Sequence, residues 1–174
     1  TVPWLVTFAV LQDLNTGVTH NTICMAAGEP RGHSKDDIRR GRAIYHDSVN
    51  FVKQVRDGMP ITQPSIFRPF KPMKAKSNDT PEDTSDWLAQ AKLDGYRCTI
   101  HVKNGNARAF SANVKEQTDV LPELDEIEWP MGEWIFDAEV VADDGEYVST
   151  KERMQRDPSS TLPHTMNFWV FDVI

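Results

Sequence analysis

Four residues whose types and spacing could support chemistry, a lysine, an aspartate, a glycine and an arginine, fall within one short stretch, Lys92-Leu93-Asp94-Gly95-Tyr96-Arg97. An Asp-Gly pair favours a tight turn, so the order predicts a strand, a turn and a second strand. The Lys92 amine would lie at a strand end, and the Arg97 guanidinium would follow two residues after the turn. An amine can act as a nucleophile, and a planar guanidinium matches phosphate oxygens. Four specified residues occur by chance about once in 10⁵ positions, although a charged surface hairpin would imitate part of the pattern.

The region around this stretch is predicted to be rich in β-structure. Apolar and polar residues alternate over 96–103 and 133–142, as they do in half-buried strands. Asn104-Gly105 is a hairpin signal. Together with the turn at 143–145, these patterns predict strands at 87–93, 96–103, 107–111, 133–142 and 166–174. Two short helices are also expected, one over 120–127 and one opened by a capping box at Ser149-Thr150-Lys151-Glu152.

The N-terminal region is organised differently. Apolar runs at 4–11 and 18–26, separated by a turn at 15–17, predict two strands. Ser34-Lys35-Asp36-Asp37 has the spacing of a capping box, and near-helical apolar spacing predicts one long helix over about 35–57. Five prolines make 60–86 irregular, which places a domain boundary near 60–70. We therefore divide the chain into 1–67 and 68–174.

Charge is distributed unevenly along the chain. The net charge of the 174 residues is −7, yet residues 1–76 carry 11 Lys and Arg against 6 Asp and Glu. A basic segment in an acidic chain favours a polyanionic partner for that segment. The candidates for contacts with duplex phosphates lie off the apolar stripe of the predicted helix: Arg39, Arg40, Arg42, Lys53 and Arg56. The alternative is a solvated helix face.

Several classes of protein are excluded by composition. The two cysteines, Cys24 and Cys98, are too few for a disulfide scaffold, and neither they nor the five scattered histidines have metal-ligand spacing. No apolar run approaches the ~20 residues of a membrane span, and no secretory leader is visible. We therefore expect a soluble, cytoplasmic protein without a membrane partner.

The lysine stretch resembles KxDGxR, the nucleotide-attachment motif of the covalent nucleotidyltransferases. Further resemblances follow in the order of that family. Pro72-Met73-Lys74-Ala75 resembles a segment found upstream of the lysine in DNA ligases. Phe136-Asp137-Ala138-Glu139-Val140-Val141 resembles the acidic strand motif DxEhh, and Phe168-Trp169-Val170-Phe171-Asp172-Val173 resembles hhhFDhh. Over about 68–174 the chain is most similar to phage-type ATP-dependent DNA ligases.

This resemblance implies an α+β fold, the antiparallel-sheet adenylation domain of DNA ligases and mRNA capping enzymes. The domain would be incomplete and preceded by a small, basic, ββα-like segment. Lys92 would attack the α-phosphate of ATP and form a lysyl-AMP phosphoramidate. Because a free lysine has a pKa near 10.4, we expect burial and neighbouring cations, Arg97 and Mg²⁺ or another divalent ion, to lower it.

The resemblance also implies roles for other residues. Asp94 would shape the turn, and Gly95 would permit a positive φ and close approach of the nucleotide. The nucleoside contacts would be ribose hydroxyls on Glu139, adenine stacking on Phe171 and the adenine edge on Gln90. The alternative for Glu139 is a solvated carboxylate. For Phe171 it is an ordinary core residue, and for Gln90 an ordinary strand residue. Ala112 stands where the resemblance implies a phosphate-binding arginine, so contact with the nick phosphate would depend on Lys115 or Arg108 as a substitute.

The function expected from these features is the sealing of nicked duplex DNA by a monomeric, ATP-dependent DNA ligase. The later family motifs and an OB-fold domain are absent from the sequence, so we expect this chain to be a fragment unable to complete ligation. Two alternatives stay open. One is an RNA ligase or a capping guanylyltransferase of the same fold, and the other is a non-catalytic DNA-binding remnant.

Overall fold

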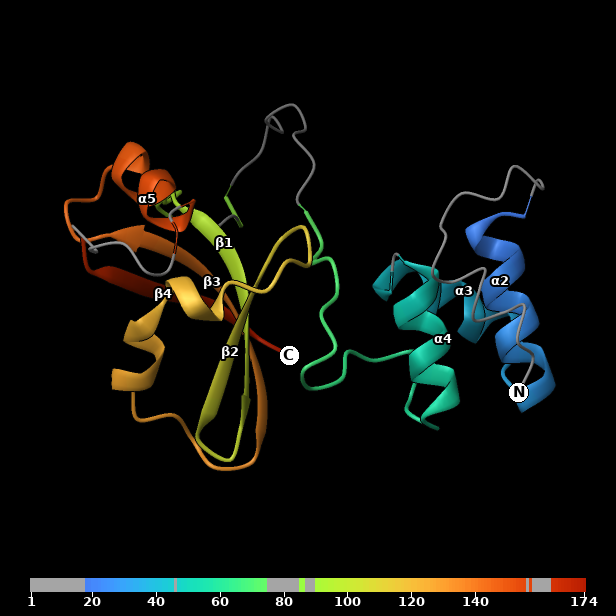
Figure 1. The fold of residues 1–174 in the computed structure, drawn as a ribbon. Coiled ribbons are helices and arrows are strands. Elements are labelled where there is room, and N and C mark those ends of the chain that lie inside the picture. The colour runs from blue at the N-terminus through green and yellow to red at the C-terminus, as the bar shows by residue number, and fades with distance from the viewer. Residues whose placement is uncertain (1–17, 46, 75–84, 87–89, 156, 158–163) are drawn as a thin grey trace. The chain divides into compact units, whose positions relative to one another are not determined.

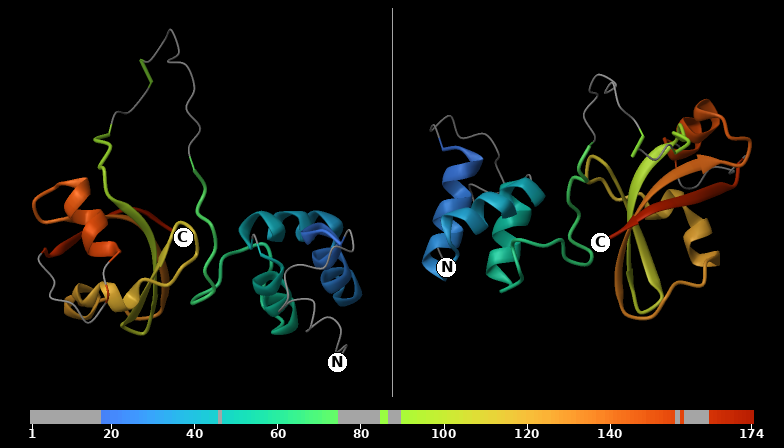
Figure 2. Two further views of the ribbon diagram at one scale, coloured as in Figure 1. Left: turned by 45° about the horizontal axis from the view of Figure 1, so that its top comes forward. Right: turned by 180° about the vertical axis from the view of Figure 1, so that it is seen from behind.

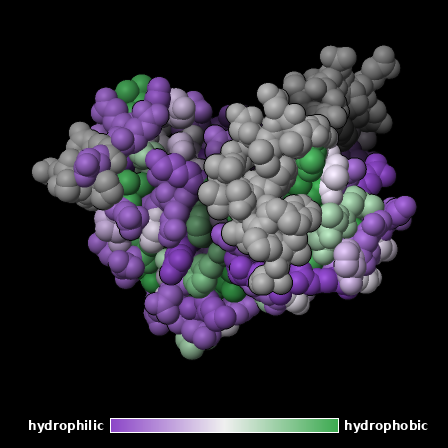
Figure 3. Space-filling view, turned by 45° about the vertical axis from the view of Figure 1, so that its right-hand side comes forward, coloured by the Kyte–Doolittle hydropathy of each residue, from purple (hydrophilic) through white to green (hydrophobic). Residues whose placement is uncertain are grey.

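The computed structural model describes residues 18–45, 47–74, 85–86, 90–155, 157 and 164–174. The chain divides into two compact units, Thr1–Lys71 and Pro72–Ile174. Figure 1 labels the elements of both. None of the described helices has the length and apolar character needed to cross a bilayer. On the face shown in Figure 3, hydrophilic side chains predominate and hydrophobic ones form small, separate patches.

The described part of the first unit is helical. Its elements are α2 (His20–Gly28), the 3₁₀ turn η1 (Glu29–Arg31), α3 (Lys35–Ile44) and α4 (Ser48–Arg56). One small core joins the helices and the loop that follows α4, made of Cys24, Ile38, Tyr45, Phe51, Val55 and Ile61. Gly41 allows α3 to pack closely, because a Cβ there would lie 2.8 Å from the Ile61 carbonyl oxygen and from Phe51 Cε2.

The strand expected at 18–26 is wrong, because residues 20–26 belong to helix α2 and Thr19 is its cap. Thr19 caps that helix by accepting a hydrogen bond from the Thr22 N–H at 3.3 Å. A short apolar run does not distinguish a strand from a buried helix, and here the helical reading holds. The strand expected at 4–11 and the turn at 15–17 lie outside the described residues. The ββα-like arrangement is therefore replaced, where the structure is described, by helices.

The single helix expected over 35–57 is also wrong. Its start is confirmed, since Ser34 caps α3 and accepts a hydrogen bond from the Asp37 N–H at 3.1 Å. However, α3 ends at Ile44, and Asp47 begins a new helix by accepting from the Asn50 N–H at 2.8 Å. An aspartate that caps its own downstream turn stabilises a break in an otherwise periodic sequence. The apolar spacing survives the break because both helices bury residues in the same core.

The second unit is built on a four-stranded antiparallel sheet with strand order β2-β1-β3-β4 (Figure 2). The strands are β1 (Tyr96–Lys103), β2 (Asn106–Ser111), β3 (Glu133–Ala142) and β4 (Met166–Val173). The strands expected at 96–103, 107–111, 133–142 and 166–174 are thus confirmed, with the Asn104-Gly105 turn between β1 and β2. The α+β class with an antiparallel sheet is confirmed with them.

The core of this unit lies on one face of the sheet. Cys98, Ile100 and Val102 of β1 pack with β3 and with the turns η2 (Thr118–Val120) and η3 (Pro122–Glu126) and helix α5 (Tyr147–Met154). The fully buried Arg153 fixes these elements, because its guanidinium binds the Glu123 carboxylate at 3.1 Å and the Val120 carbonyl. The opposite face of the sheet carries the polar residues of the candidate site.

Three expectations about this unit need correction. No strand forms over 90–93, because this part runs as an extended segment before β1, while 87–89 lie outside the described residues. The helix expected over 120–127 is a pair of 3₁₀ turns. Helix α5 has the expected length of about two turns but begins at Tyr147, with Glu146 at the cap. Ser149 lies inside the helix and donates to Asp144 Oδ2 at 2.6 Å.

Candidate nucleotide-binding site

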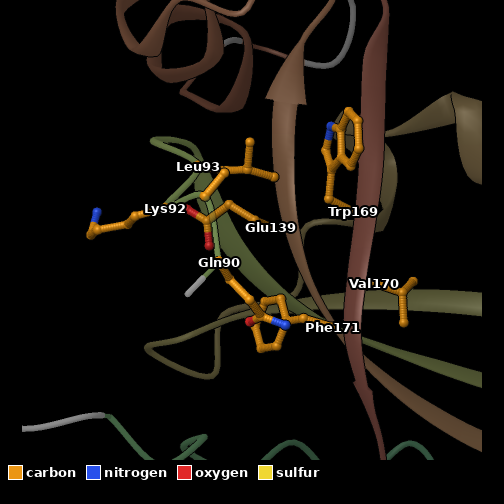
Figure 4. Close-up of a pocket in the computed structure, with 8 residues that line it drawn as sticks. Gln90, Lys92, Leu93, Glu139, Trp169, Val170 and Phe171 are labelled. Carbon is orange, nitrogen blue, oxygen red and sulfur yellow. The ribbon is translucent and has the colours of Figure 1, made fainter. Parts of the chain in front are cut away.

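A pocket of about 650 Å³ lies beside the lysine segment (Figure 4). Its lining comes from the segment before β1, from β3 and from β4: Gln90, Ala91, Lys92, Leu93, Glu139, Trp169, Val170 and Phe171. Four residues expected from the sequence are therefore brought together here, namely Gln90, Lys92, Glu139 and Phe171. The expectation that Lys92 is buried is wrong, because its side chain extends from this segment and is exposed.

Gly95 joins the lysine segment to β3. Its N–H donates to Glu139 Oε1 at 3.0 Å. A Cβ at position 95 would lie 2.4 Å from the Val140 carbonyl oxygen and 2.7 Å from Val141 Cγ2, so only glycine fits without a shift of β3. The positive φ expected at this glycine is wrong, since the left-handed glycines of the described chain are Gly32, Gly58, Gly105, Gly132 and Gly145. Close approach, and not turn geometry, requires Gly95.

The Glu139 carboxyl lies among several charges. Burial raises its pKa, while the hydrogen bond from Gly95 and the positive charges of Lys92 and Arg97 act in the opposite direction. The negative charge of Asp94 adds to the upward shift of that pKa. Asp94 is itself exposed at the bend before β1. Glu139 is therefore oriented by the lysine motif and is close enough to respond to its charges.

Arg97 makes four contacts with three groups. Its Nε donates to Asp137 Oδ1 at 3.0 Å and its Nη2 to Oδ2 at 2.6 Å. Its Nη1 donates to the Met73 carbonyl oxygen at 2.8 Å, and its Cζ lies 5.3 Å from the centre of the Phe171 ring. The hydrogen bonds to Asp137 raise the pKa of Arg97 above its usual value. The guanidinium is thus a fixed positive charge beside the pocket.

A β-bulge places Phe171. Asp137 pairs with Asp172, and the next residue of β3, Ala138, pairs with Val170, so Phe171 is the extra residue on β4. A bulge changes the direction in which side chains leave a strand and is frequent near functional sites. In Figure 4, Phe171 and Val170 project to opposite sides of β4. Phe171 thereby meets the Arg97 guanidinium.

Two residues of the site were missed by sequence reasoning. Asp137, which is 3% exposed, orients Arg97, and Trp169 lines the pocket. A signal for each was present, because Asp137 and Trp169 lie two residues before Glu139 and Phe171 on their strands. In a regular strand, residues two apart share a face. The Met73 carbonyl contact had no such signal, because it comes from the backbone of a distant segment.

The loop after β2 has Ala112 where the resemblance implies a phosphate-binding arginine, and the structure shows how this loop is attached. The Ala112 N–H donates to the Arg97 carbonyl oxygen at 3.2 Å. Lys115 lines a second pocket, of about 430 Å³, together with Tyr96 of the lysine motif. Arg108 lies on β2, opposite His101. Of the two candidate substitutes, Lys115 is therefore the one that shares a pocket with the motif.

The basic residues singled out in the first unit lie on α3 and α4. Arg39, Arg40 and Lys53 are exposed. Arg42 donates to Asn21 Oδ1 at 2.6 Å, and Arg56 forms an ion pair with Asp57 at 2.7 Å. Exposed cations remain available to a polyanion, whereas Arg56 is already engaged by Asp57, a carboxylate that it shares with Arg68.

Known proteins similar to this chain are DNA ligases. DNA ligase 1 of Korarchaeum cryptofilum is 27% identical over 98% of this chain and 34% of its own length. A DNA ligase of Natronomonas pharaonis is 31% identical over 78% of this chain and 27% of its own length. The chain thus spans about a third of these relatives. Among solved structures, the ligase domain of LigD from M. tuberculosis is 20% identical with a TM-score of 0.39, covering 48% of this chain and 28% of that one.

A family match covers the unit that contains the pocket. Residues 72–174 match the family described as ATP dependent DNA ligase domain. The matched residues make up more than half of the chain, and they include the lysine motif, the Glu139 strand and the Phe171 strand. The chain therefore belongs to the ATP-dependent DNA ligase domain family.

Proposed function

We propose that this chain carries the adenylation site of an ATP-dependent DNA ligase that seals nicks in duplex DNA. The observation that supports this most strongly is the shared pocket of Lys92 and Glu139, in which the Glu139 carboxylate is oriented by the Gly95 N–H. A nucleophile and a hydrogen-bond acceptor on one side of an open pocket suit a nucleoside triphosphate. Family membership supports ATP as the nucleotide.

In the proposed first step, the neutral amine of Lys92 attacks the α-phosphorus of ATP. A P–N bond forms, the bond from that phosphorus to the β-bridging oxygen breaks, and pyrophosphate leaves with the electron pair while nitrogen loses a proton. Glu139 accepts hydrogen bonds from the ribose hydroxyls, and Phe171 and Gln90 contact the adenine. AMP then passes to the 5′-phosphate of a nick, and attack by the 3′-hydroxyl releases AMP.

A divalent cation, Mg²⁺ or another, is part of this proposal. Protein-bound Mg²⁺ commonly takes one or two carboxylates together with substrate phosphates and water. Asp94 suits such a site, because its carboxylate is exposed next to the lysine segment and acts electrostatically on Glu139. Asp137 does not, since Arg97 occupies both of its oxygens. When bound, such an ion neutralises charge that develops on the phosphates.

The experiment that tests the first step is covalent labelling with ATP or GTP radiolabelled at the α-phosphate, in the presence of Mg²⁺. We expect label from ATP on the parent and none on Lys92→Arg. Lys103→Arg is the matched control, because Lys103 lies at the far end of β1 in an exposed ion pair with Glu133. Preferential labelling by GTP would favour the capping-enzyme alternative. An unlabelled parent, with either nucleotide, would contradict adenylation by this chain.

The first unit is proposed to hold duplex DNA through its phosphates, with the protein acting as a monomer. The exposed charges of Arg39, Arg40 and Lys53 support this role. Such contacts are insensitive to sequence and weaken with salt. If DNA binding persisted while Lys92 stayed unlabelled and no nucleotide bound, the non-catalytic alternative would be favoured.

A further inference from the structure

Trp169 is an exposed aromatic residue inside the candidate site. Its side chain lines the pocket together with Lys92 and Glu139, and it is 55% exposed. Large aromatic side chains are highly buried on average, because they remove much apolar area from water. An indole left open at the wall of a pocket is therefore available to a ligand that offers a flat or apolar surface.

The sheet register places this indole next to Glu139. Glu139 and Trp169 are direct partners across the β3–β4 pair. Directly opposite residues of antiparallel strands have Cβ atoms about 4.5–5.5 Å apart and lie on the same face. Because the Gly95 N–H fixes the Glu139 carboxylate, the position of Trp169 is defined relative to the lysine segment as well. A ligand held by Glu139 would thus meet the indole.

The two aromatic residues of β4 differ in their surroundings. Phe171 lies against the Arg97 guanidinium, with 5.3 Å from Cζ to the ring centre. Within the described residues, the ring pairs are His101 with Phe110 and Phe136 with Trp129 and Trp134, so no other ring stacks on Trp169. One face of Phe171 is therefore in contact with Arg97, whereas no described ring stacks on Trp169.

We propose that Trp169 forms the ribose-side wall of the nucleotide pocket and packs against the bound nucleoside. This assignment rests on the proposed function, because it takes the nucleotide to be held by Glu139. It makes Trp169 a binding residue that adds affinity for a nucleoside without touching the reacting phosphate. We expect packing of the nucleoside against the indole to change affinity on the scale of base–aromatic stacking, about tenfold.

Kinetics of Lys92 labelling test the affinity part of this assignment. Trp169→Leu should raise the KM for ATP about tenfold and leave the maximal labelling rate within about twofold. Trp169→Phe keeps a ring and should restore most of the affinity. Trp134→Leu is the matched control, since Trp134 is 41% exposed and is not part of the pocket lining. An unchanged KM in Trp169→Leu would overturn the assignment.

Tryptophan fluorescence gives a readout that a merely structural role would not change. ATP with Mg²⁺ should alter the emission of the parent and of Trp134→Phe, and this change should be lost in Trp169→Phe. A change of undiminished size in Trp169→Phe would overturn the assignment, because it would come from the other four tryptophans. A parent that shows no emission change although its Lys92 is labelled normally would overturn it too. A Trp169-dependent change without labelling would instead support the pocket and contradict the ligase step. A parent that shows neither an emission change nor Lys92 labelling would contradict both the assignment of Trp169 and the proposed adenylation.

Discussion

Asp137 accepts two parallel hydrogen bonds from Arg97, at 3.0 Å from Nε and 2.6 Å from Nη2. This bidentate pair fixes both the position and the plane of the guanidinium. The remaining edge of Arg97 donates to the Met73 carbonyl, and its face meets Phe171. Asp137 is thus a positioning residue that acts on the pocket through Arg97.

Asp137→Asn should therefore weaken both stability and nucleotide binding. The Asp137 side chain is 5% exposed, so loss of its charge should lower the free energy of unfolding by about 2 kcal/mol. The KM for ATP should rise several-fold, because Arg97 loses its fixed orientation. Urea unfolding and Lys92 labelling measure the two effects. Glu133→Gln, which breaks the exposed ion pair with Lys103, is the control and should lower the free energy of unfolding by less than about 1 kcal/mol. Equal losses of stability and of nucleotide binding in the two variants would contradict the positioning role of Asp137.

Gly95→Ala should be strongly disruptive. The added Cβ would lie 2.4 Å from the Val140 carbonyl oxygen, which is backbone and cannot rotate away. We expect a loss of about 1–3 kcal/mol in the free energy of unfolding, as for other overpacked sites, together with loss of the Glu139 hydrogen bond and of labelling. The comparison is Gly105→Asn in the β1–β2 turn, where nothing lies within 4 Å and asparagine tolerates the positive φ. A Gly95→Ala variant that labels normally would show that close approach is not required.

Stability should fall in mild acid because of His101. This side chain is fully buried, and burial lowers its pKa from 6.5 to about 4. Between these values the unfolded chain takes up a proton and the folded chain does not, so the free energy of unfolding decreases as the pH falls from about 7 toward 4. The full loss corresponds to about 3 kcal/mol.

His101→Phe tests this dependence, because phenylalanine keeps an aromatic ring beside Phe110 and does not titrate. The measurement is urea unfolding at several pH values, with the parent compared with the variant. As the pH falls below 6.5, the free energy of unfolding should decrease more in the parent than in the variant. If the free energies of unfolding of parent and variant fell in parallel with pH, His101 would not be the cause of the loss of stability in acid.

DNA binding by the basic helices should depend on salt. Each phosphate contact that is lost reduces the slope of log affinity against log salt by about 0.9. Arg39→Ala, Arg40→Ala and Lys53→Ala should each show this reduction with duplexes of any sequence, measured by fluorescence anisotropy. Arg56→Ala is the internal comparison, because the Arg56 guanidinium is held by Asp57 at 2.7 Å and is less free to bind a phosphate, so the slope should change less. A slope insensitive to all four changes would place the DNA contacts elsewhere.

Local sequence signals were sufficient for much of the second unit. Period-two alternation placed β1 and β3, and Asn104-Gly105 placed the hairpin between β1 and β2. In the first unit the same kind of reasoning failed at two points. The apolar run of α2 fits either a helix or a strand, and the break before Asp47 depends on a cap that the periodic pattern conceals. Short apolar runs and internal caps are decided by packing against the rest of the chain.

The sequence by itself was enough to identify the motifs in the order of the ligase family and to name Lys92 as the candidate nucleophile. It also named Gln90, Glu139 and Phe171 as candidate nucleoside contacts. Only the tertiary structure decided how they meet. The Arg97–Asp137 pair and the Gly95–Glu139 contact join residues 40 and 44 positions apart, and the bulge that directs Phe171 depends on how β4 pairs with β3. Spacing along a chain reports local geometry, whereas register, bulges and close backbone approach arise from pairing between distant strands, which local spacing does not encode.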